Sequence, residues 1–321
     1  MSLFWINGIL SWQLTPGGWL ASGSVWQGFF NPSFWPSLLF RTLTSMATAA
    51  LVATLVVNLS PRFNHDERRT LIRAAFWFLA PMVLMPPLGV WFMAVLPASA
   101  RQWATGGSIA MTLFLSISVG ASALIGGYAA AVLLRKGLTI NGATAAMLVA
   151  LGFGATAGAE FVREGVRKPY TVRGALYSNS ITQPEVERLR REGCVASDPY
   201  PLRNAQETPN DQLRTGAAVF RIQCSVCHTI DGANGLLHLT DGWTDRQLHL
   251  NIAQLQRTKP FMPPFAGASE EVLALAEWIK WNEAGRPKQW KERQDEQALQ
   301  AIQEYLDEAG TAPGVEVPGD Q

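Results

Sequence analysis

Two cysteines and a histidine form the stretch of this chain whose residue types and spacing specify a chemical reaction. Cys224 and Cys227 are separated by two residues, and His228 follows directly. Two thiols at this spacing can each form a thioether with one vinyl group of a single haem, which brings the adjacent histidine beneath the iron. The sequence therefore predicts one covalently bound haem c, with His228 as an axial ligand of the iron.

Met262 is the candidate ligand for the opposite face of the haem. It stands in the segment Phe261-Met-Pro-Pro-Phe265, where the two prolines exclude a packed helical face. A thioether sulfur is soft and uncharged, so it favours reduced iron and raises the reduction potential. We predict Met262 as the sixth ligand, and His238 and His249 are the alternatives.

Zinc or disulfide exchange would be the other chemistry for a pair of cysteines at this spacing. A zinc site needs a second pair of ligands, but the only further cysteine, Cys194, lies far upstream without a partner beside it. A redox pair of the thioredoxin kind expects alternating strands and helices, whereas the flanks here favour helices. We therefore prefer the haem interpretation and expect Cys194 to be an unpaired thiol.

Charge is distributed very unevenly along the 321 residues, although the formal net charge is only +1. The stretch after Arg163 is rich in both signs, whereas few charges precede it. Between Arg73 and Arg163 the formal charges are Arg101, Arg135, Lys136 and Glu160. This division predicts a membrane half followed by a water-soluble half. The absence of a basic excess argues against nucleic acid as a partner.

Four apolar runs are long enough to cross the ~30 Å hydrocarbon layer as helices. They are Phe34–Val57, Leu71–Leu96, Gly107–Leu134 and Ala143–Phe161. Pro81, Pro86 and Pro87 should kink the second run, because each proline removes an intrahelical donor. Residues 61–69 are expected to be a loop. Gly154 and Gly158 have the spacing of small residues that allows another helix to approach closely.

Residues 1–33 do not reach a spanning length, and no cationic segment marks them as a cleavable signal peptide. Tryptophans recur at every seventh residue, which suits a helix that lies flat in the membrane interface. These residues are Trp5, Trp12, Trp19 and Trp26. We expect Pro16, Gly17 and Gly18 to interrupt any longer helix.

Two arguments place both termini outside the cytoplasm of a bacterium, with the four spans in its inner membrane. Haem attachment to this motif takes place on the extracytoplasmic, periplasmic side. Positive charges mark the cytoplasmic loops, and they occur in the first and third expected loops, at Arg62, Arg68, Arg69, Arg135 and Lys136.

A charged cluster breaks this rule just beyond the fourth span. Glu160, Arg163, Arg167 and the following Lys-Pro-Tyr170 resemble the Glu-x-Gly-Arg-Gln-Pro-Trp segment in the large subunit of cytochrome bd quinol oxidases. The run from Phe34 through Phe-Arg41 to Met46 is similar to the helix of that family that carries a haem-ligating methionine. The resemblance implies a bd-like membrane module.

The chain also departs from that family. None of its four histidines lies in the expected spans, so a bis-histidine membrane haem is not expected, and only Glu160 could correspond to the family's acidic haem residue. We favour a scaffold in which Glu160, Arg163 and Arg167 anchor the helix end and Arg41 extends to the interface. A quinol or haem site built from these residues is the alternative.

Residues 164–209 are expected to be a connector along the membrane surface or a partner, with one short charged helix at 184–192. Residues 210–285 resemble a class I cytochrome c throughout. They predict helices at 211–222, 245–256 and 272–282, capped by Asn210, Thr244 and Ser269. In that family the last helix crosses the first at a glycine, here Gly216, and a loop carbonyl, here within 232–237, holds the haem histidine.

The predicted fold is all-α: a four-helix transmembrane domain at 34–163 follows the interfacial segment and precedes the connector and the haem domain. A charged helix at 288–308 and a flexible tail from Thr311 complete the final region, 286–321. We predict a membrane-anchored monohaem cytochrome c that transfers single electrons among the membrane and redox subunits of a respiratory complex, rather than a catalyst on its own. The alternative is a subunit of a bd-like quinol- or oxygen-reacting enzyme.

Overall fold

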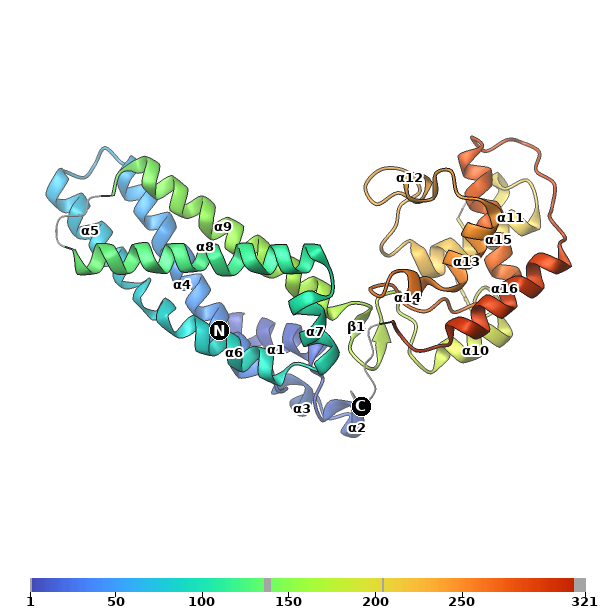
Figure 1. Ribbon diagram of the computed structural model, residues 1–321, viewed down its shortest axis with the longest axis horizontal. Helices are drawn as coiled ribbons and strands as arrows, with labels where there is room; N and C mark the ends of the chain where they lie inside the picture. Colours follow the sequence, from blue (N-terminus) through green and yellow to red (C-terminus); the bar gives the residue numbers. More distant parts are fainter. Residues whose placement is uncertain (1, 136–139, 204, 315–321) are drawn as a thin grey trace. The chain divides into compact units, whose positions relative to one another are not determined.

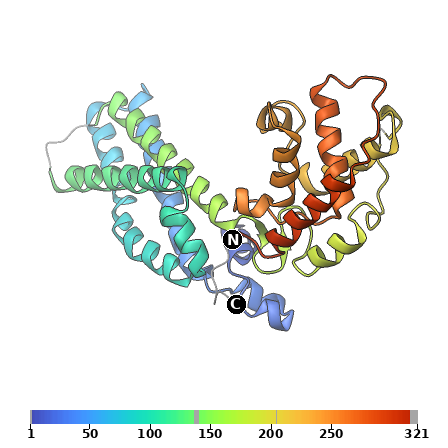
Figure 2. The ribbon, with the colours of Figure 1, turned by 45° about the vertical axis from the view of Figure 1, so that its right-hand side comes forward.

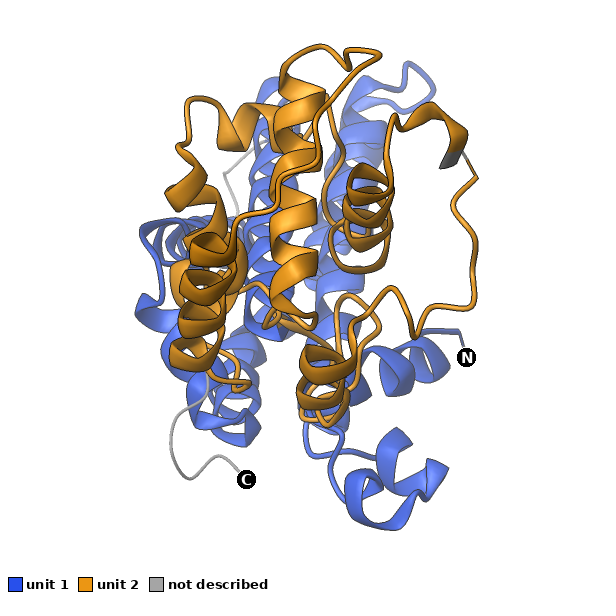
Figure 3. Cartoon of the chain, turned by 90° about the vertical axis from the view of Figure 1, so that its right-hand side faces the viewer, with its two compact units in different colours: residues 1–167, 317–321 blue, residues 168–316 orange. Residues whose placement is uncertain are grey.

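The protein is described by a computed structural model that covers residues 2–135, 140–203 and 205–314 (Figure 1). It divides into two compact units, one that holds the chain up to Arg167 and one that begins at Lys168 (Figure 3). Each unit has its own buried apolar core. The predicted division between a membrane half and a water-soluble half therefore corresponds to two separately packed units.

Four segments of the first unit are long and apolar enough to cross a membrane, as predicted. Helix α4 spans Phe34–Leu59, α8 spans Ile109–Leu134 and α9 spans Gly142–Arg167. The remaining segment, His65–Val95, is continuous in length but broken into three helical pieces, α5 (His65–Trp77), η1 (Ala80–Leu84) and α6 (Met85–Val95). A short helix that the sequence did not predict, α7 (Ala98–Gly106), precedes α8.

The prolines interrupt this segment where the sequence predicted a kink. Pro81 lies in the 3₁₀ turn η1, and Pro86 and Pro87 occupy the first turn of α6, where a missing N–H costs little. The expected loop at 61–69 is wrong in its second half, because α5 already begins at His65. The side chain of Asn64 accepts hydrogen bonds from the first turn while Glu67 accepts one from the backbone of Asn64, a reciprocal cap that starts the helix early.

Helices α8 and α9 run side by side along the first unit (Figures 1 and 2). The two helices pack tightly at Gly158, where an added Cβ would lie 2.5 Å from the backbone oxygen of Phe114. Gly154, one turn earlier in α9, has open space in the same position. Only one of the two small residues in the predicted spacing therefore serves the helix contact.

This difference predicts opposite effects of the same substitution at two positions of one helix. Gly158→Ala should separate α8 from α9 and lower the free energy of unfolding by about 1–3 kcal/mol. Gly154→Ala is the matched control, which should be neutral or slightly stabilising because alanine favours helix over glycine. Thermal unfolding of both variants in detergent measures the difference, and equal stabilities would contradict the packing described for Gly158.

The N-terminal segment forms α1 (Ser2–Leu14), α2 (Trp19–Ser22) and α3 (Val25–Phe29), which are separated at Pro16 and Gly17 as predicted. Buried polar side chains join these pieces to the start of α4. The hydroxyl of Thr15 donates to Asn31 at 2.8 Å, and Asn7 Nδ2 donates to the carbonyl of Phe34 at 2.9 Å. The segment is thus packed onto the first long helix, and its position flat in the interface stays a prediction.

The second unit is helical apart from a two-stranded antiparallel hairpin, β1 (Tyr170–Val172) and β2 (Leu176–Tyr177). The first helices are α10 (Glu185–Glu192), η2 (Ala205–Glu207), α11 (Asp211–Val219) and the π-helical turn η3 (Phe220–Cys224). They are followed by α12 (Leu236–Thr240), α13 (Asp245–Ala253), α14 (Leu255–Thr258), α15 (Ser269–Glu283) and α16 (Glu296–Ala309). The predicted caps Asn210 and Thr244 are confirmed, but Ala268, and not Ser269, precedes α15.

Helices α11 and α15 form the centre of this unit. An added Cβ on Gly216 would lie 2.2 Å from the backbone oxygen of Ala274 and 2.6 Å from the Cβ of Trp278. One turn further along, the ring of Phe220 packs on that of Trp278 with 4.9 Å between centroids. The expected crossing at Gly216 is confirmed, because only a residue without a side chain fits between the two helices.

The connector was expected to lie along the membrane surface or a partner. It instead contributes to the core of the haem domain. Tyr170, Tyr177 and Val186 are fully buried, and α10 covers the predicted short helix. The backbone N–H groups of Cys194 and Val195 donate to the carboxylate of Glu271 on α15 at 2.9 and 2.8 Å. The apolar side chains of the connector explain this result, because burying them in the core is more favourable than leaving them exposed to water.

The final charged segment is helical only from Glu296, later than the predicted Lys288. Asp295 caps α16, and Ile302 and Leu306 are buried against the rest of the unit. The preceding residues instead run along α11, where Gln212 and the backbone of Arg293 exchange two hydrogen bonds. Most of the predicted flexible tail, from residue 315 onward, lies outside the described residues.

Charged side chains bind α13 and α15 to the segment before α16. Asp245 accepts a hydrogen bond from Lys280 at 2.7 Å and forms a second ion pair with Arg293. Arg293 also pairs with Asp295 at 2.8 Å. The hydrogen bond from Lys280 and the pair with Arg293 lower the pKa of Asp245. His249, one turn further along α13, is buried beside these charges, and its Nε2 has no hydrogen-bond partner among the described residues.

His249 makes stability depend on pH. Burial, followed by the nearby Arg293, lowers its pKa below the ordinary value of 6.5, despite the opposing carboxylates of Asp245 and Glu277. Below 6.5 the unfolded chain binds a proton that the folded state excludes, so stability is complete above that value and declines as pH falls. We expect the urea midpoint of the second unit to drop between about pH 7 and about pH 5, and His249→Gln to flatten this decline. An identical pH profile in the variant would contradict the role of His249.

Candidate functional site

Cys224, Cys227 and His228 lie in one continuous turn at the end of η3. The backbone N–H groups of Cys227 and His228 both donate to the carbonyl of Cys224, at 3.0 and 2.9 Å. Cys227 is exposed and Cys224 is partly covered by the core of the unit. The turn therefore presents two thiols and an imidazole from a short stretch of backbone, which is the arrangement that attachment to a single haem requires.

The loop after the motif fixes the imidazole of His228. Its Nδ1 lies 3.1 Å from the carbonyl oxygen of Asn234, while the side chain of Asn234 donates to the carbonyl of Cys227. Asn234 has a left-handed backbone (φ 57°), which an asparagine adopts more readily than most residues. Because Nδ1 is held by a carbonyl, the ring keeps Nε2 as the nitrogen that can bind iron. The predicted loop carbonyl is thus identified as that of Asn234.

Met262 lies in a short irregular segment between α14 and α15. Its backbone N–H closes a turn onto Lys259 at 2.8 Å, and its side chain is half-buried. Phe265 and Ala266, a few residues further on, are fully buried and fix the segment to the core. Arg190 of the connector donates to the carbonyl of Phe265 at 2.9 Å. The methionine is therefore carried by a loop that is fixed to the core on its C-terminal side.

Gln223 joins the Met262 loop to the haem motif, and sequence reasoning missed it. This residue directly precedes Cys224 and is buried. Its amide nitrogen donates to the carbonyl of Ala266 at 2.8 Å, and its amide oxygen accepts from the N–H of Ala266 at 2.9 Å. One side chain thus makes a paired, backbone-like contact between the segment that carries the thiols and the segment that carries Met262. A glutamine before the first cysteine carries no recognisable signal in a single sequence.

Removal of this contact should loosen the methionine without detaching the haem. In Gln223→Ala we expect covalent haem to be retained, while methionine ligation is lost at a lower temperature or lower urea concentration than in the wild type. The buried backbone groups of Ala266 lose their partners, at a cost of about 1–3 kcal/mol each. The far-red charge-transfer band of methionine-ligated ferric haem, followed during heating, measures this change. A wild-type profile in Gln223→Ala would contradict a positioning role.

The surroundings of the motif are suited to a large apolar ring. Half-buried hydrophobic side chains pack against the core on both sides of the motif, namely Phe220, Ile222, Ile230 and Leu236. The protein donors available are thiols, one imidazole nitrogen and one thioether, which match the attachment and axial ligation of haem iron. A bound haem would supply a one-electron iron couple there, held by Cys224 and Cys227 and ligated by His228 and Met262.

The third cysteine is removed from this chemistry. Cys194 is buried, its sulfur accepts a hydrogen bond from Gln223 at 3.3 Å, and it forms no disulfide. Burial, followed by the adjacent Glu271 carboxylate, raises the pKa of the Cys194 thiol. The thiol is therefore protonated and unreactive at neutral pH, in agreement with the expected unpaired residue.

The charged residues singled out in the membrane half lie at the end of α9 and the start of α4. Arg163 donates to Glu160 at 2.8 Å, and Arg41 is within electrostatic range of both. Arg167 instead pairs with Glu164 at 2.6 Å. The structure brings Arg41, Glu160 and Arg163 together, and none of the four histidines joins them in the part of the chain that is described.

Comparison with known proteins identifies the second unit. The family model described as cytochrome c oxidase, cbb3-type, subunit III matches residues 211–279, which run from the start of α11 through most of α15. No curated protein and no solved structure matches the chain. The chain therefore combines a cytochrome c domain, whose cofactor is covalently bound haem c, with four candidate membrane helices, as the sequence predicted. It is a membrane-anchored cytochrome c that takes part in electron transfer.

Proposed function

We propose that the protein carries one haem c and passes single electrons within a respiratory membrane complex. Cys224 and Cys227 form the two thioethers, and His228 and Met262 ligate the iron from opposite faces. The observation that carries this proposal is the contact between His228 Nδ1 and the Asn234 carbonyl. This contact leaves Nε2 of the imidazole to bind the iron of a haem that the neighbouring thiols would attach.

Transfer, rather than catalysis, follows from the ligand set. If the chain fills both axial positions, the iron has no open position for oxygen or peroxide. The two hydrogen bonds between Gln223 and Ala266 support this arrangement, because they limit the movement of the loop that carries Met262. We infer that the protein acts as an electron-transfer subunit and is not a catalyst on its own.

The membrane half suggests partners. One helix would be enough to anchor a soluble domain, and the additional spans offer packing surfaces for other membrane subunits. The name of the matched family refers to an oxidase, which favours redox subunits of that kind as neighbours. We place the haem domain on the periplasmic side of a bacterial inner membrane, in agreement with the positive charges of the first and third loops.

Visible spectroscopy and carbon monoxide binding test the proposal on the purified protein. The reduced protein should show the absorption of haem c alone, and carbon monoxide should leave its spectrum unchanged because no axial position is open. A large spectral change with carbon monoxide would overturn the proposed ligation and favour a haem sensor or a catalytic site.

A bd-like quinol- or oxygen-reacting module is the second candidate function. The observation in its favour is the ion pair of Glu160 and Arg163, with Arg41 within electrostatic range, which places a carboxylate at the end of a membrane helix. No comparison supports this resemblance or quinol as a partner. Pigment extraction tests for a membrane haem: haem b or d in the isolated subunit would support the module, and haem c as the single pigment would exclude a membrane haem but not a quinol site.

A further inference from the structure

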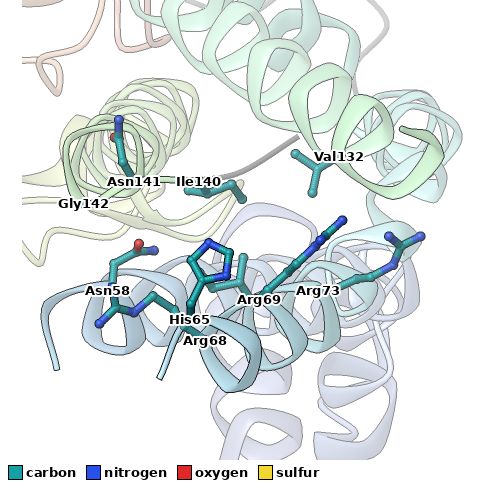
Figure 4. Close-up of a pocket in the computed structure, with 10 residues that line it drawn as sticks. Asn58, His65, Arg68, Arg69, Arg73, Val132, Ile140, Asn141 and Gly142 are labelled. Carbon is teal, nitrogen blue, oxygen red and sulfur yellow. The ribbon is translucent and has the colours of Figure 1, made fainter. Parts of the chain in front are cut away.

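A basic cavity lies in the first unit, at the end of the bundle where α4 leads into α5 and α8 ends beside the start of α9. Its volume is about 250 Å³. Three arginines and a histidine from one face of α5 line it, namely His65, Arg68, Arg69 and Arg73. Figure 4 shows His65, Arg69 and Arg73 in a row that faces Val132 and Ile140 across the cavity.

Part of this basic row is held in place by the protein. Arg68 donates to the carbonyl of Ser60 at 3.1 Å, and its buried Nε has no hydrogen-bond partner in the part of the chain that the structure describes. Arg73 donates to the carbonyl of Leu133 at the end of α8, also at 3.1 Å. Because both partners are backbone oxygens, which carry no formal charge, these bonds do not neutralise the two guanidinium groups. Among the described residues that line the cavity none is acidic; the nearby Asp66, whose side chain is almost fully exposed, lies 3.6 Å from Nδ1 of His65.

The opposite wall adds to the positive potential. Asn141 and Gly142 line the cavity at the first turn of α9, a helix of 26 residues, and the side chain of Asn141 caps this helix by accepting from Thr144 at 2.8 Å. The positive end of the helix dipole therefore faces the same space as the guanidinium groups. Both features favour a ligand with concentrated negative charge, and guanidinium groups match the geometry of phosphate oxygens.

Apolar surface around the cavity indicates that this ligand is an amphiphile. Ile72, Val132 and Ile140, which line the cavity, are buried apolar side chains. Leu59 and Leu134, at the ends of α4 and α8, are 69% and 82% exposed. Acyl chains would cover such surface, whereas a free phosphate ion would not. The volume lies below the ~300–1,000 Å³ of sites that enclose whole drug-sized ligands, which suits a headgroup whose chains remain outside.

We propose that this cavity binds the phosphate of an anionic phospholipid headgroup, with Arg69 and Arg73 as its principal ligands and the first turn of α9 on the other side. The site is independent of the haem and of the proposed electron transfer. It would hold an anionic lipid at the end of the bundle where α4 leads into α5 and α8 ends beside the start of α9.

Native mass spectrometry of the delipidated, full-length holoprotein in non-ionic detergent tests the proposal. Phosphatidylglycerol and phosphatidylcholine are titrated separately, and gel filtration in detergent together with the thermal unfolding of the first unit reports that each variant is folded. The wild type should prefer phosphatidylglycerol. Arg69→Gln combined with Arg73→Gln should weaken its binding about 100-fold, at about tenfold for each direct hydrogen bond to a charged group, while the corresponding lysine variants retain most of it.

Arg62→Gln combined with Arg135→Gln is the matched control, because it removes two exposed arginines from the same end of the bundle that do not line the cavity. A much smaller change in this control supports a defined site. Equal losses in both double variants would overturn the proposal in favour of diffuse attraction. Equal binding of phosphatidylcholine would also overturn it, as would displacement of phosphatidylglycerol by an equimolar amount of inorganic phosphate, which would identify a free anion as the ligand.

Discussion

Replacement of Met262 by alanine should leave the haem attached and lower its reduction potential by on the order of 100 mV or more, within the ~0.8 V range that axial ligands control. The thioether stabilises ferrous iron, and a water or an empty position in its place does not. The far-red charge-transfer band should disappear, and carbon monoxide should bind the reduced protein. Redox titration and visible spectra of the variant measure all three changes.

The adjacent residue provides the control for this prediction. Phe261 shares the loop with Met262 and is more exposed, so Phe261→Ala alters the loop without removing the sulfur. We expect the spectrum of this variant to remain that of six-coordinate haem. If Met262→Ala keeps the wild-type spectrum and potential, the sixth ligand is another residue, and His238 and His249 are then the candidates to replace in turn.

Loss of both cysteines of the motif should abolish covalent haem. The double variant Cys224→Ala and Cys227→Ala retains His228 but forms no thioether, so haem staining on a denaturing gel should vanish. Cys227→Ala alone should weaken the stain, because one thioether remains possible. The second unit should also be less stable, since the half-buried apolar side chains beside the motif lose the ring that would cover them.

Cys194→Ala is the matched control for the cysteine variants. It removes the remaining thiol of the chain, which is buried and hydrogen-bonded to Gln223 rather than placed in the motif. Haem staining should be unchanged. A stain that persists in the double variant, or that disappears with Cys194, would contradict the assignment of the two thioethers.

The sequence predicted those features that depend on neighbouring residues. Asn210 and Thr244 start helices because their side chains accept hydrogen bonds from the next turn. Pro81 breaks the second membrane segment for a similarly local reason. The haem motif belongs to the same class, since the chemistry requires the two thiols and the imidazole within five residues. Gly216 could be anticipated only from the resemblance to class I cytochromes c.

Contacts between distant segments could not be predicted in this way. Gln223 and Ala266 meet through amide groups that are present in every protein, so nothing in their types marks the pair. Arg190 on α10 looks like one charge of an exposed helix, yet it donates to the carbonyls of Phe265 and Leu306. The connector was therefore expected to lie apart from the domain that it completes. Tertiary burial, which single-sequence patterns do not encode, decided its position.

The basic residues of the first loop illustrate a further limit. Their number indicated a cytoplasmic side, which is a statement about topology alone. The early start of α5 at His65 places Arg68 and Arg69 on one helix face with His65 and Arg73, and this face then borders a cavity with the first turn of α9. The charge pattern predicted which side of the membrane the residues occupy, and the structure was needed to identify a binding site among them.

The central claim is that one haem is joined to the chain through Cys224 and Cys227, and the intact mass of the denatured protein tests it most directly. The account predicts the mass of the chain plus one haem, with a single thiol, Cys194, that reacts with an alkylating reagent only after unfolding. A mass equal to that of the bare chain, with three reactive thiols, would contradict it.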